Sequence, residues 1–391
     1  MKKDDFFSKE ELERYSRHLI IPEFNIDGQK KLKSAKVLVV GTGGLGAPLL
    51  QYLTAAGVGT IGVVDFDVVE DSNLQRQVLF STDDVGKPKT EAAVERMKGL
   101  NPHIEFKIYN TQLNSSNALD IIKEYDIVAD GTDNFPTRYL VNDACVLLNK
   151  PYVYASIFRF DGQLTVFNYQ YEDGTTGPNY RDLYSEPPPP GLVPSCAEGG
   201  VIGVLPGILG SLQANEVIKV LSGVGDPLIG RMFSFDTLGF ETRIFKFKKD
   251  PKNPISGENP TIHELIDYEH FCGIPQQEEE DAKQESVKEL SAKELKELKE
   301  NGEDFQLIDV REEFEYRISN LGGELIPLNN VLDEAGKIAK DKKVVVHCRT
   351  GARSGDAIRA LKEKFGYDNL YNLKGGILEY ADEIDDSLAK Y

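Results

Sequence analysis

Cysteine is scarce in this sequence, with four residues in a chain of 391. Four thiols are too few to build a disulfide framework for a chain of this length, which argues against a small disulfide-stabilised secreted fold. A cysteine with a chemical role is therefore expected to act as a reactive thiolate in a reducing cytoplasm.

Positive charge is also in short supply: 45 basic side chains face 64 acidic ones, for a formal net charge of −19. Such a chain repels phosphate backbones, so nucleic acid is not an expected partner. Residues 37–64 carry no charge and are long enough to span a bilayer, but GTGGLGAP and AAGVGT interrupt them with turns. The N-terminal sequence is too acidic for a signal peptide. We expect a cytoplasmic protein that does not bind membranes.

Apolar runs alternate with helical patterns over residues 1–255, which predicts a Rossmann-like, doubly wound α/β domain. The expected strands lie at 36–40, 60–66, 104–109, 125–130, 151–157, 162–169 and from about 240. Residues 256–286, which include the charged stretch QQEEEDAKQE, are expected to form a linker. A smaller α/β domain restarts over 287–391, with a capped helix from 291 and strands at 305–310 and 343–347.

A glycine-rich loop follows the first expected strand, with Gly41, Gly43, Gly44 and Gly46 in the pattern GxGxxG. Glycines there let the backbone approach a phosphate, and the following helix N-terminus supplies free N–H groups. Asp65 ends the next strand, 19 positions after the loop, where an acid commonly binds ribose hydroxyls. This pattern alone predicts a nucleotide site and leaves an NAD-dependent oxidoreductase open.

Polar motifs after successive strands narrow that choice. They comprise Asp67, the segment Ser72-Asn73-Leu74-Gln75-Arg76, Lys89 in GKPK, and Asp133 with Asn134 in GTDN. Together they would surround a triphosphate with an amide, an arginine, a lysine and a carboxylate. Hydride transfer needs none of these groups, so a pyrophosphate-releasing step fits better.

In order and spacing, RYSRHLIIPEF, GTGGLGAP, DFDVVEDSNLQRQ, VGKPK and DGTDN resemble ThiF/MoeB-type adenylating enzymes, a family related to the ubiquitin activators. The resemblance covers about residues 10–250. It implies that ATP activates the C-terminal Gly-Gly carboxylate of a small ubiquitin-like sulfur-carrier protein. It also implies ATP contacts for Gly44, Asp65, residues 72–76, Lys89, Asp133 and Asn134. Asp133 would hold Mg²⁺, and Arg17 would reach across a homodimer to the phosphates.

The sequence departs from that family at one place. Relatives usually carry two CxxC pairs that hold a structural zinc, but the first pair's positions here read Asn179 and Asp182. The second region keeps only Cys272. Because tetrahedral zinc takes four nitrogen or sulfur ligands, we expect no zinc site.

Two of the four cysteines are candidates for chemistry. Cys145 lies in a helical apolar pattern and, like Cys272, is expected to be structural. Cys196 lies on a Pro- and Gly-rich loop, and the family resemblance implies a covalent bond to the activated carrier; the alternative is a dispensable loop thiol. Cys348 directly follows a strand and precedes a helix, so backbone N–H groups and two arginines would favour its thiolate.

The loop after Cys348 is expected to cradle an anion. It comprises Arg349, Thr350, Gly351, Ala352, Arg353 and Ser354. Protein phosphatases need five residues between cysteine and arginine, whereas four intervene here, which makes a tighter loop suited to sulfur.

With LIDVREEFEYRI and LKGGILEY, residues 287–391 resemble the rhodanese sulfurtransferases. Asn320 and Tyr380 stand where that family usually has His and Trp. The resemblance implies a persulfide on Cys348, supplied by a cysteine desulfurase or thiosulfate. A catalytically silent rhodanese fold is the alternative.

The two resemblances together imply adenylation of a sulfur carrier followed by sulfur transfer to a C-terminal thiocarboxylate. Such chemistry serves molybdopterin, thiamine or cysteine biosynthesis, or tRNA thiolation. Two other classes stay open at this point: an NAD-binding oxidoreductase and a non-catalytic sulfur-sensing scaffold.

Overall fold

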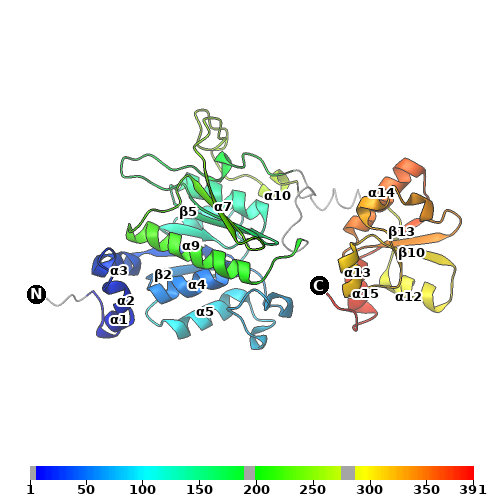
Figure 1. Ribbon diagram of the computed structural model, residues 1–391, viewed down its shortest axis with the longest axis horizontal. Coiled ribbons are helices and arrows are strands. Elements are labelled where there is room, and N and C mark those ends of the chain that lie inside the picture. The colour runs from blue at the N-terminus through cyan, green and yellow to red at the C-terminus, as the bar shows by residue number, and fades with distance from the viewer. Residues whose placement is uncertain (1–5, 189–198, 274–286) are drawn as a thin grey trace, which may run out of the picture. The chain divides into compact units, whose positions relative to one another are not determined.

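The computed structural model describes residues 6–188, 199–273 and 287–391, which form two compact units, Met1–Ile274 and Pro275–Tyr391 (Figure 1). Residues 256–273, expected to be part of a linker, instead pack on the first unit. Ser115 Oγ donates to the Ile266 carbonyl at 2.5 Å, and the Tyr268 hydroxyl donates to Asp143 at 2.8 Å. The first unit thus extends past residue 255, and the rest of the expected linker lies outside the described residues.

An eight-stranded sheet in the order β3-β2-β1-β4-β5-β6-β7-β8 forms the centre of the first unit. Its strands are β1 Lys36–Val40, β2 Thr60–Asp65, β3 Glu105–Asn110, β4 Ile127–Asp130, β5 Tyr152–Phe158, β6 Asp161–Phe167, β7 Arg231–Asp236 and β8 Glu241–Lys246. The five strands β3, β2, β1, β4 and β5 are parallel to one another. On the β5 side the sheet continues with β6, β7 and β8, each antiparallel to the strand before it. The predicted α/β sheet is confirmed, while β7 was not predicted.

Helices cover both faces of this sheet. The helices of the unit are α1 Lys9–Arg14, α2 Ser16–Leu19, α3 Asn25–Ser34, α4 Gly46–Ala56, α5 Lys89–Leu100, α6 Ala118–Ile122, α7 Phe135–Leu147, α9 Val204–Ser222 and α10 Tyr268–Phe271, with 3-10 turns Asp71–Asn73, Thr82–Asp84 and Tyr180–Asp182. Buried side chains of α4, α5 and α9 form the core on one face, and those of α6 and α7 form the core on the other. No helix among the described residues is long and apolar enough to cross a membrane.

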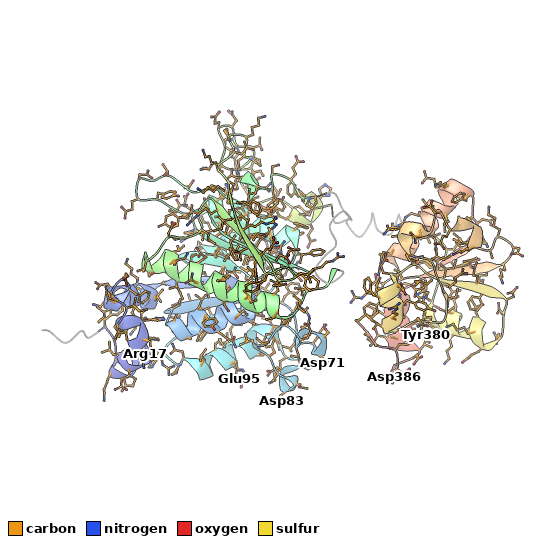
Figure 2. The ribbon with its side chains drawn as sticks, viewed as in Figure 1. Arg17, Asp71, Asp83, Glu95, Tyr380 and Asp386 are labelled. Atoms are coloured by element: carbon orange, nitrogen blue, oxygen red, sulfur yellow. The ribbon has the colours of Figure 1, made fainter. Side chains whose placement is uncertain are left out.

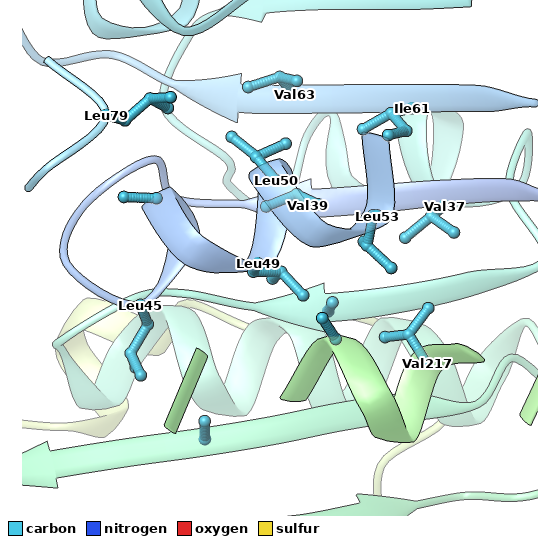
Figure 3. Close-up of a cluster of buried hydrophobic side chains, with 14 of the residues drawn as sticks. Val37, Val39, Leu45, Leu49, Leu50, Leu53, Ile61, Val63, Leu79 and Val217 are labelled. Atoms are coloured by element: carbon cyan, nitrogen blue, oxygen red, sulfur yellow. The ribbon is translucent and has the colours of Figure 1, made fainter. Parts of the chain in front are cut away.

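The first strand shows how the sequence builds both cores. Val37 and Val39 face α4 and α9, whereas Leu38 and Val40 face the core around α7. All four side chains are buried, because successive residues of a strand point to opposite faces and both faces are covered. Figure 3 shows the first of these clusters, with Leu49 and Leu53 of α4 among the side chains that pack with Val37, Val39 and Val63 of the strands. This packing fixes the position of the glycine loop between β1 and α4.

The second unit is built on a five-stranded parallel sheet in the order β11-β10-β12-β13-β9. The strands are β9 Glu289–Leu290, β10 Phe305–Asp309, β11 Glu324–Leu325, β12 Lys343–His347 and β13 Leu370–Leu373. The helices are α12 Ala292–Glu300, α13 Glu313–Ile318, α14 Ala352–Phe365 and α15 Gly376–Glu383, with 3-10 turns Leu328–Asn330 and Ala335–Lys337. Ser291 caps α12 as predicted, since its hydroxyl accepts from the Glu294 N–H at 3.3 Å.

Candidate active sites

A cavity of about 200 Å³ lies where β1, β2 and β4 end in the first unit. Most of the residues predicted to bind a nucleotide line it, although they come from four separate motifs of the sequence. Those in the lining are Gly41, Gly43, Gly44, Asp65, Asp67, Arg76, Lys89, Asp133 and Asn134. Gly46, Ser72, Asn73, Leu74 and Gln75 are predicted site residues that do not line it.

The glycine loop can adopt its path only without side chains. Gly41 has a φ of +88°, a conformation that other residues rarely adopt. A Cβ on Gly46 would lie 2.1 Å from the Gly41 carbonyl oxygen, so α4 begins directly against the end of β1. The residues of the loop that precede α4, including Gly41, Gly43 and Gly44, line the cavity with backbone, an arrangement suited to a phosphate.

Asp65, the last residue of β2, holds the glycine loop through hydrogen bonds. Its Oδ2 accepts hydrogen bonds from the Thr42 N–H at 2.8 Å and the Thr42 hydroxyl at 2.7 Å. Its Oδ1 accepts from the Asp67 N–H at 3.0 Å. The carboxylate is thus oriented within the cavity wall, and Thr42 is a loop-holding residue that the sequence pattern did not single out.

Two cations line the cavity among the described residues. Lys89 Nζ lies 2.8 Å from Asp67 Oδ2, and the lysine side chain is only 7% exposed while that of Asp67 is 50% exposed. The Arg76 guanidinium donates to the Ser72 carbonyl at 3.1 Å. The 72–76 segment therefore contributes Arg76 to the cavity, while its other residues build the turn that carries it.

Gln77 is a lining residue that sequence reasoning missed. Its side chain is buried, its Oε1 has no hydrogen-bond partner, and its Nε2 would lie 3.6 Å from a Cβ on Gly43. A buried amide oxygen without a partner beside a glycine loop offers a hydrogen-bond acceptor to a ligand in the cavity. The only sequence signal was its place directly after Arg76.

The loop that carries Asp133 rests on a buried polar base. Asp130 Oδ1 accepts from the Thr132 N–H at 2.8 Å and from its hydroxyl at 2.5 Å, and the Tyr152 hydroxyl donates to Asp130 Oδ2 at 2.5 Å. Complete burial raises the pKa of Asp130. Asn134 caps α7 by accepting from the Thr137 N–H at 2.9 Å. Asp133 itself is exposed in the cavity wall, where an oxygen ligand is accessible to a cation.

Arg17 does not line the cavity of its own chain. It is exposed on the four-residue helix α2, and Figure 2 shows it well separated from Asp71, which directly precedes the 72–76 segment.

Polar hydrogen bonds occupy the region where relatives were expected to hold zinc. Asn253 Nδ2 donates to Asn179 Oδ1 at 3.1 Å and to Asp182 Oδ1 at 2.7 Å, and Asn179 Nδ2 donates to Ser256 at 2.7 Å. Burial raises the pKa of Cys272 to about 11, so this thiol is protonated at neutral pH. This donor set does not fit tetrahedral zinc. Across the described ranges, no group of three His, Cys, Asp or Glu side chains could hold a metal ion.

A buried ion pair lies next to these residues. The Arg181 guanidinium contacts both carboxylate oxygens of Asp143, at 2.7 and 2.8 Å, and both side chains are at most 1% exposed. Tyr268 adds the hydroxyl contact to Asp143 described above. The pair ties the turn at 180–182 to α7 and α10 without a metal.

The sulfur chemistry predicted for the second unit would centre on Cys348, at the end of β12. Its side chain is 1% exposed, the Gly351 N–H lies 3.1 Å from its Sγ, and the Ser354 hydroxyl lies 3.4 Å from it. Ser354 is held in turn by Asn372 Oδ1 at 2.6 Å. The predicted 349–354 cradle thus forms a loop followed by the first turn of α14, and Asn372 is a supporting residue that the sequence did not reveal.

The start of α15 supports the cradle from outside. The Ile377 N–H donates to the Cys348 carbonyl at 3.0 Å, and the Leu378 N–H donates to the Arg349 carbonyl at 3.2 Å. Gly376 has a φ of +61°, and a Cβ there would lie 2.5 Å from the Arg349 carbonyl oxygen. The glycines of LKGG therefore allow α15 to hold the loop closely.

Ion pairs hold two arginines near the cradle, Arg353 and Arg311. Glu315 on α13 accepts from both terminal nitrogens of Arg353 at 2.7 Å, and these bonds hold the pKa of Glu315 below its usual value although burial opposes them. Arg311 forms a fully buried pair with Asp309. Beside it, burial lowers the pKa of His347 to about 4, so this imidazole is neutral. Glu315 lies 38 positions from Arg353, and no local pattern indicated the pair.

The remaining cysteines are accounted for as follows. Cys145 is buried in α7, where burial raises the pKa of its thiol. Cys196 lies outside the described residues.

These two sites define the class of protein: an adenylyltransferase joined to a sulfurtransferase. The ThiF family model matches residues 15–255, more than half of the chain, and the rhodanese-like domain model matches residues 291–383. The chain belongs to the ThiF family and carries a rhodanese-like domain.

Two curated relatives and one solved structure illustrate the likeness. The probable adenylyltransferase/sulfurtransferase MoeZ of Mycobacterium tuberculosis is 48% identical over 98% of this chain and 96% of its own length. The sulfur carrier protein adenylyltransferase of Thermus thermophilus is 54% identical over 68% of this chain and 99% of its own. The crystal structure of E. coli MccB with ATP aligns with a TM-score of 0.52 and 26% identity, covering 59% of this chain and 69% of MccB.

Proposed function

We propose that this enzyme adenylates the C-terminal Gly-Gly carboxylate of a small ubiquitin-like sulfur-carrier protein and then converts it to a thiocarboxylate. The observation that carries the proposal is the pairing of two sites in one chain: a glycine-loop cavity lined by Arg76, Lys89 and Asp133, and a cysteine cradle around Cys348. The names of the relatives, which pair adenylyltransferase with sulfurtransferase or specify a sulfur carrier, support it.

ATP fits the first cavity. Gly41 and Gly46 pack closely against backbone, which holds the loop at the strand ends, and Gly41, Gly43 and Gly44 line the cavity without side chains that would fill it. The carrier's carboxylate oxygen attacks the α-phosphorus, the bond to the β-phosphate oxygen breaks, and pyrophosphate leaves with the electron pair. Arg76 and Lys89 stabilise the charge that develops on the phosphates. Hydride transfer develops no charge on phosphate groups that these two cations would stabilise, so the observed lining favours adenylation.

Mg²⁺ would be held by Asp133, the exposed carboxylate of the lining, and would neutralise phosphate charge when bound. Among the described residues the lining carries three aspartates against Arg76 and Lys89, and Lys89 is already paired with Asp67. A triphosphate therefore needs further positive charge. We propose that Arg17 of a second copy supplies it, which makes the working enzyme a homodimer.

In the sulfur-transfer step, the terminal sulfur of a Cys348 persulfide attacks the acyl carbon of the adenylate, and AMP leaves. The product is an acyl disulfide on Cys348. Attack by a thiolate on the Cys348 sulfur then releases the carrier thiocarboxylate and leaves a disulfide that a reductant must reopen. Cys196 is the proposed attacking thiol on sequence grounds, and the Gly351 N–H and Ser354 hydroxyl stabilise the Cys348 sulfur when it is an anion.

The proposal also includes the sulfur donor, the carrier pathway and the cellular compartment. A cysteine desulfurase or thiosulfate supplies the sulfur, and the identity of the carrier decides between molybdopterin, thiamine, cysteine and tRNA-thiolation pathways. A reducing cytoplasm suits a chain whose chemistry needs free thiols. We also propose that no structural zinc is required, because Asn179 and Asp182 are engaged with Asn253.

Carrier-dependent exchange of labelled pyrophosphate into ATP tests the adenylation. Asp133→Ala should abolish exchange by removing the Mg²⁺ carboxylate, whereas Cys348→Ser should leave it intact. Asp236→Ala is the matched control, because it replaces an aspartate that does not line the cavity. Its rate of pyrophosphate exchange should equal that of wild type. Undiminished exchange in Asp133→Ala would remove that residue from the mechanism, and no exchange with any Gly-Gly-ended carrier would remove adenylation itself.

A further inference from the structure

One side chain contacts several charged groups beside the cysteine cradle, and the mechanism above does not use it. The Tyr391 hydroxyl accepts a hydrogen bond from Arg311 at 2.5 Å and donates one to Glu315 Oε1 at 3.2 Å. The face of its ring carries the Arg349 guanidinium at 5.4 Å and the Arg311 guanidinium at 5.8 Å from the ring centroid. All of these contacts join residues more than 40 positions apart in the sequence.

The segment that bears Tyr391 is held in place. The Ser319 hydroxyl donates to the Ala389 carbonyl at 3.0 Å, and Lys390 pairs with Asp382. The phenol has its one donor and one acceptor contact satisfied, and burial raises its pKa to about 12, so it is neutral at neutral pH. A neutral, fixed ring can attract a guanidinium without adding a competing charge.

Tyr391 reaches both arginines of the cradle by different routes. Its ring contacts Arg349, the residue that directly follows Cys348. Its hydroxyl contacts the same carboxylate that binds Arg353 at 2.7 Å through two nitrogens. Removing the ring takes away its contact with Arg349, whereas removing only the hydroxyl takes away the contact with Glu315, which binds Arg353. The two routes can therefore be separated by substitution.

We propose that Tyr391 is a positioning residue for sulfur transfer, which holds Arg349 and, through Glu315, Arg353 in the arrangement that receives an anionic sulfur donor at Cys348. This inference rests on the proposed sulfurtransferase function. The donor class it addresses is a small anionic sulfane compound such as thiosulfate, because two fixed guanidinium groups favour an anion over a neutral molecule.

Thiosulfate with cyanide as acceptor gives a direct assay of this unit in the full-length protein. The Cys348 thiolate attacks the outer sulfur of thiosulfate, the sulfur–sulfur bond breaks, and sulfite leaves with the electron pair. Cyanide then takes the outer sulfur of the persulfide as thiocyanate and restores the thiolate. Varying thiosulfate at saturating cyanide yields kcat and KM for the anionic donor.

Tyr391→Phe keeps the ring over Arg349 and loses the hydroxyl. We expect its KM for thiosulfate to stay within about twofold of wild type and its kcat to fall about threefold. Tyr391→Ala loses both contacts, and its KM should also rise about fivefold or more. If Tyr391→Ala unfolds at the assay temperature, Tyr391→Leu replaces it, because leucine keeps apolar volume without an aromatic face. The KM of Tyr391→Leu for thiosulfate should rise as expected for Tyr391→Ala.

Tyr371 supplies a matched control. Its ring lies 5.5 Å from Lys288 Nζ and 5.3 Å from Lys343 Nζ in the same unit. Tyr371→Ala therefore removes an aromatic ring from between two cations without touching the cradle arginines. Its kcat and KM should match wild type.

Alkylation of Cys348 distinguishes a displacement of the cradle arginines from a general loosening of the fold around Cys348. Mass spectrometry of the Cys348 peptide would give the rates of alkylation by anionic iodoacetate and by neutral iodoacetamide. Misplaced arginines should lower the iodoacetate to iodoacetamide ratio at least threefold in Tyr391→Ala, whereas a loosened fold raises both rates in parallel. Parallel rates, or an unchanged KM in both ring-deletion variants, would overturn the proposal. A wild-type protein that forms no Cys348 persulfide would instead overturn the sulfurtransferase function.

Discussion

The buried pair between Arg181 and Asp143 gives the sharpest stability prediction. Both side chains are at most 1% exposed, the guanidinium makes two hydrogen bonds to the carboxylate, and Tyr268 adds a third at 2.8 Å. Arg181→Leu would leave a buried carboxylate without its cation. Breaking such a pair from one side costs about 3–5 kcal/mol, far more than the pair contributes relative to apolar residues.

The expected loss is therefore about 3–5 kcal/mol in the free energy of unfolding of the first unit for Arg181→Leu. The double variant Arg181→Leu/Asp143→Leu should recover much of it, because no charge stays buried. Arg243→Ala is the control: its pair with Glu241 has side chains 67% and 58% exposed and should be worth less than about 1 kcal/mol.

Hydrogen exchange of amides in α7 under increasing urea isolates the first unit from the second. A chain with two units need not unfold in one step, so a global signal would mix their transitions. The reasoning fails if Arg181→Leu lowers the free energy of unfolding no more than Arg243→Ala does, or if the double variant is as unstable as Arg181→Leu alone.

Three shorter predictions concern the first unit. Gly46→Val should abolish pyrophosphate exchange, measured beside a circular dichroism spectrum, because its Cβ would lie 2.1 Å from the Gly41 carbonyl oxygen. Mixing Arg17→Ala with Asp133→Ala subunits should restore roughly a quarter of wild-type exchange, since half of the dimers would be mixed and each holds one complete site; no restoration after verified subunit exchange would place Arg17 in cis or outside the site. Metal analysis should give far below one zinc per chain, and a stoichiometric, chelator-resistant zinc would contradict the polar network around Asn179.

The sequence predicted the parts of the fold that local pattern controls. Uncharged β-branched runs predicted β1 and β2, and GxGxxG predicted the loop that α4 begins against. The strand β7, RMFSFD, was missed because its mixed polarity hides a strand that only its neighbours in the sheet stabilise.

Site residues that act through tertiary contacts could not be predicted. Glu315 and Tyr391 lie 76 positions apart and meet only because α13 and the segment after α15 fold onto the same loop. No signal in the sequence pointed to Gln77 beyond its neighbours, because the burial of its amide oxygen without a partner is set by tertiary packing. Asp65 and Lys89, by contrast, were predicted at the site because their motifs come at or after the ends of successive strands and match the family's pattern, and both residues line the cavity.

The central claim is that one chain activates a carrier at one site and delivers sulfur from Cys348. The intact mass of a Gly-Gly-ended carrier, incubated with ATP, Mg²⁺, thiosulfate and a reductant, tests it most directly. Wild type should convert the carrier to a species heavier by about 16 Da, the difference between sulfur and oxygen in a thiocarboxylate. Cys348→Ala should yield none while pyrophosphate exchange continues unchanged. A full yield of thiocarboxylate from Cys348→Ala would contradict the account, because sulfur would then reach the carrier without the rhodanese-like unit.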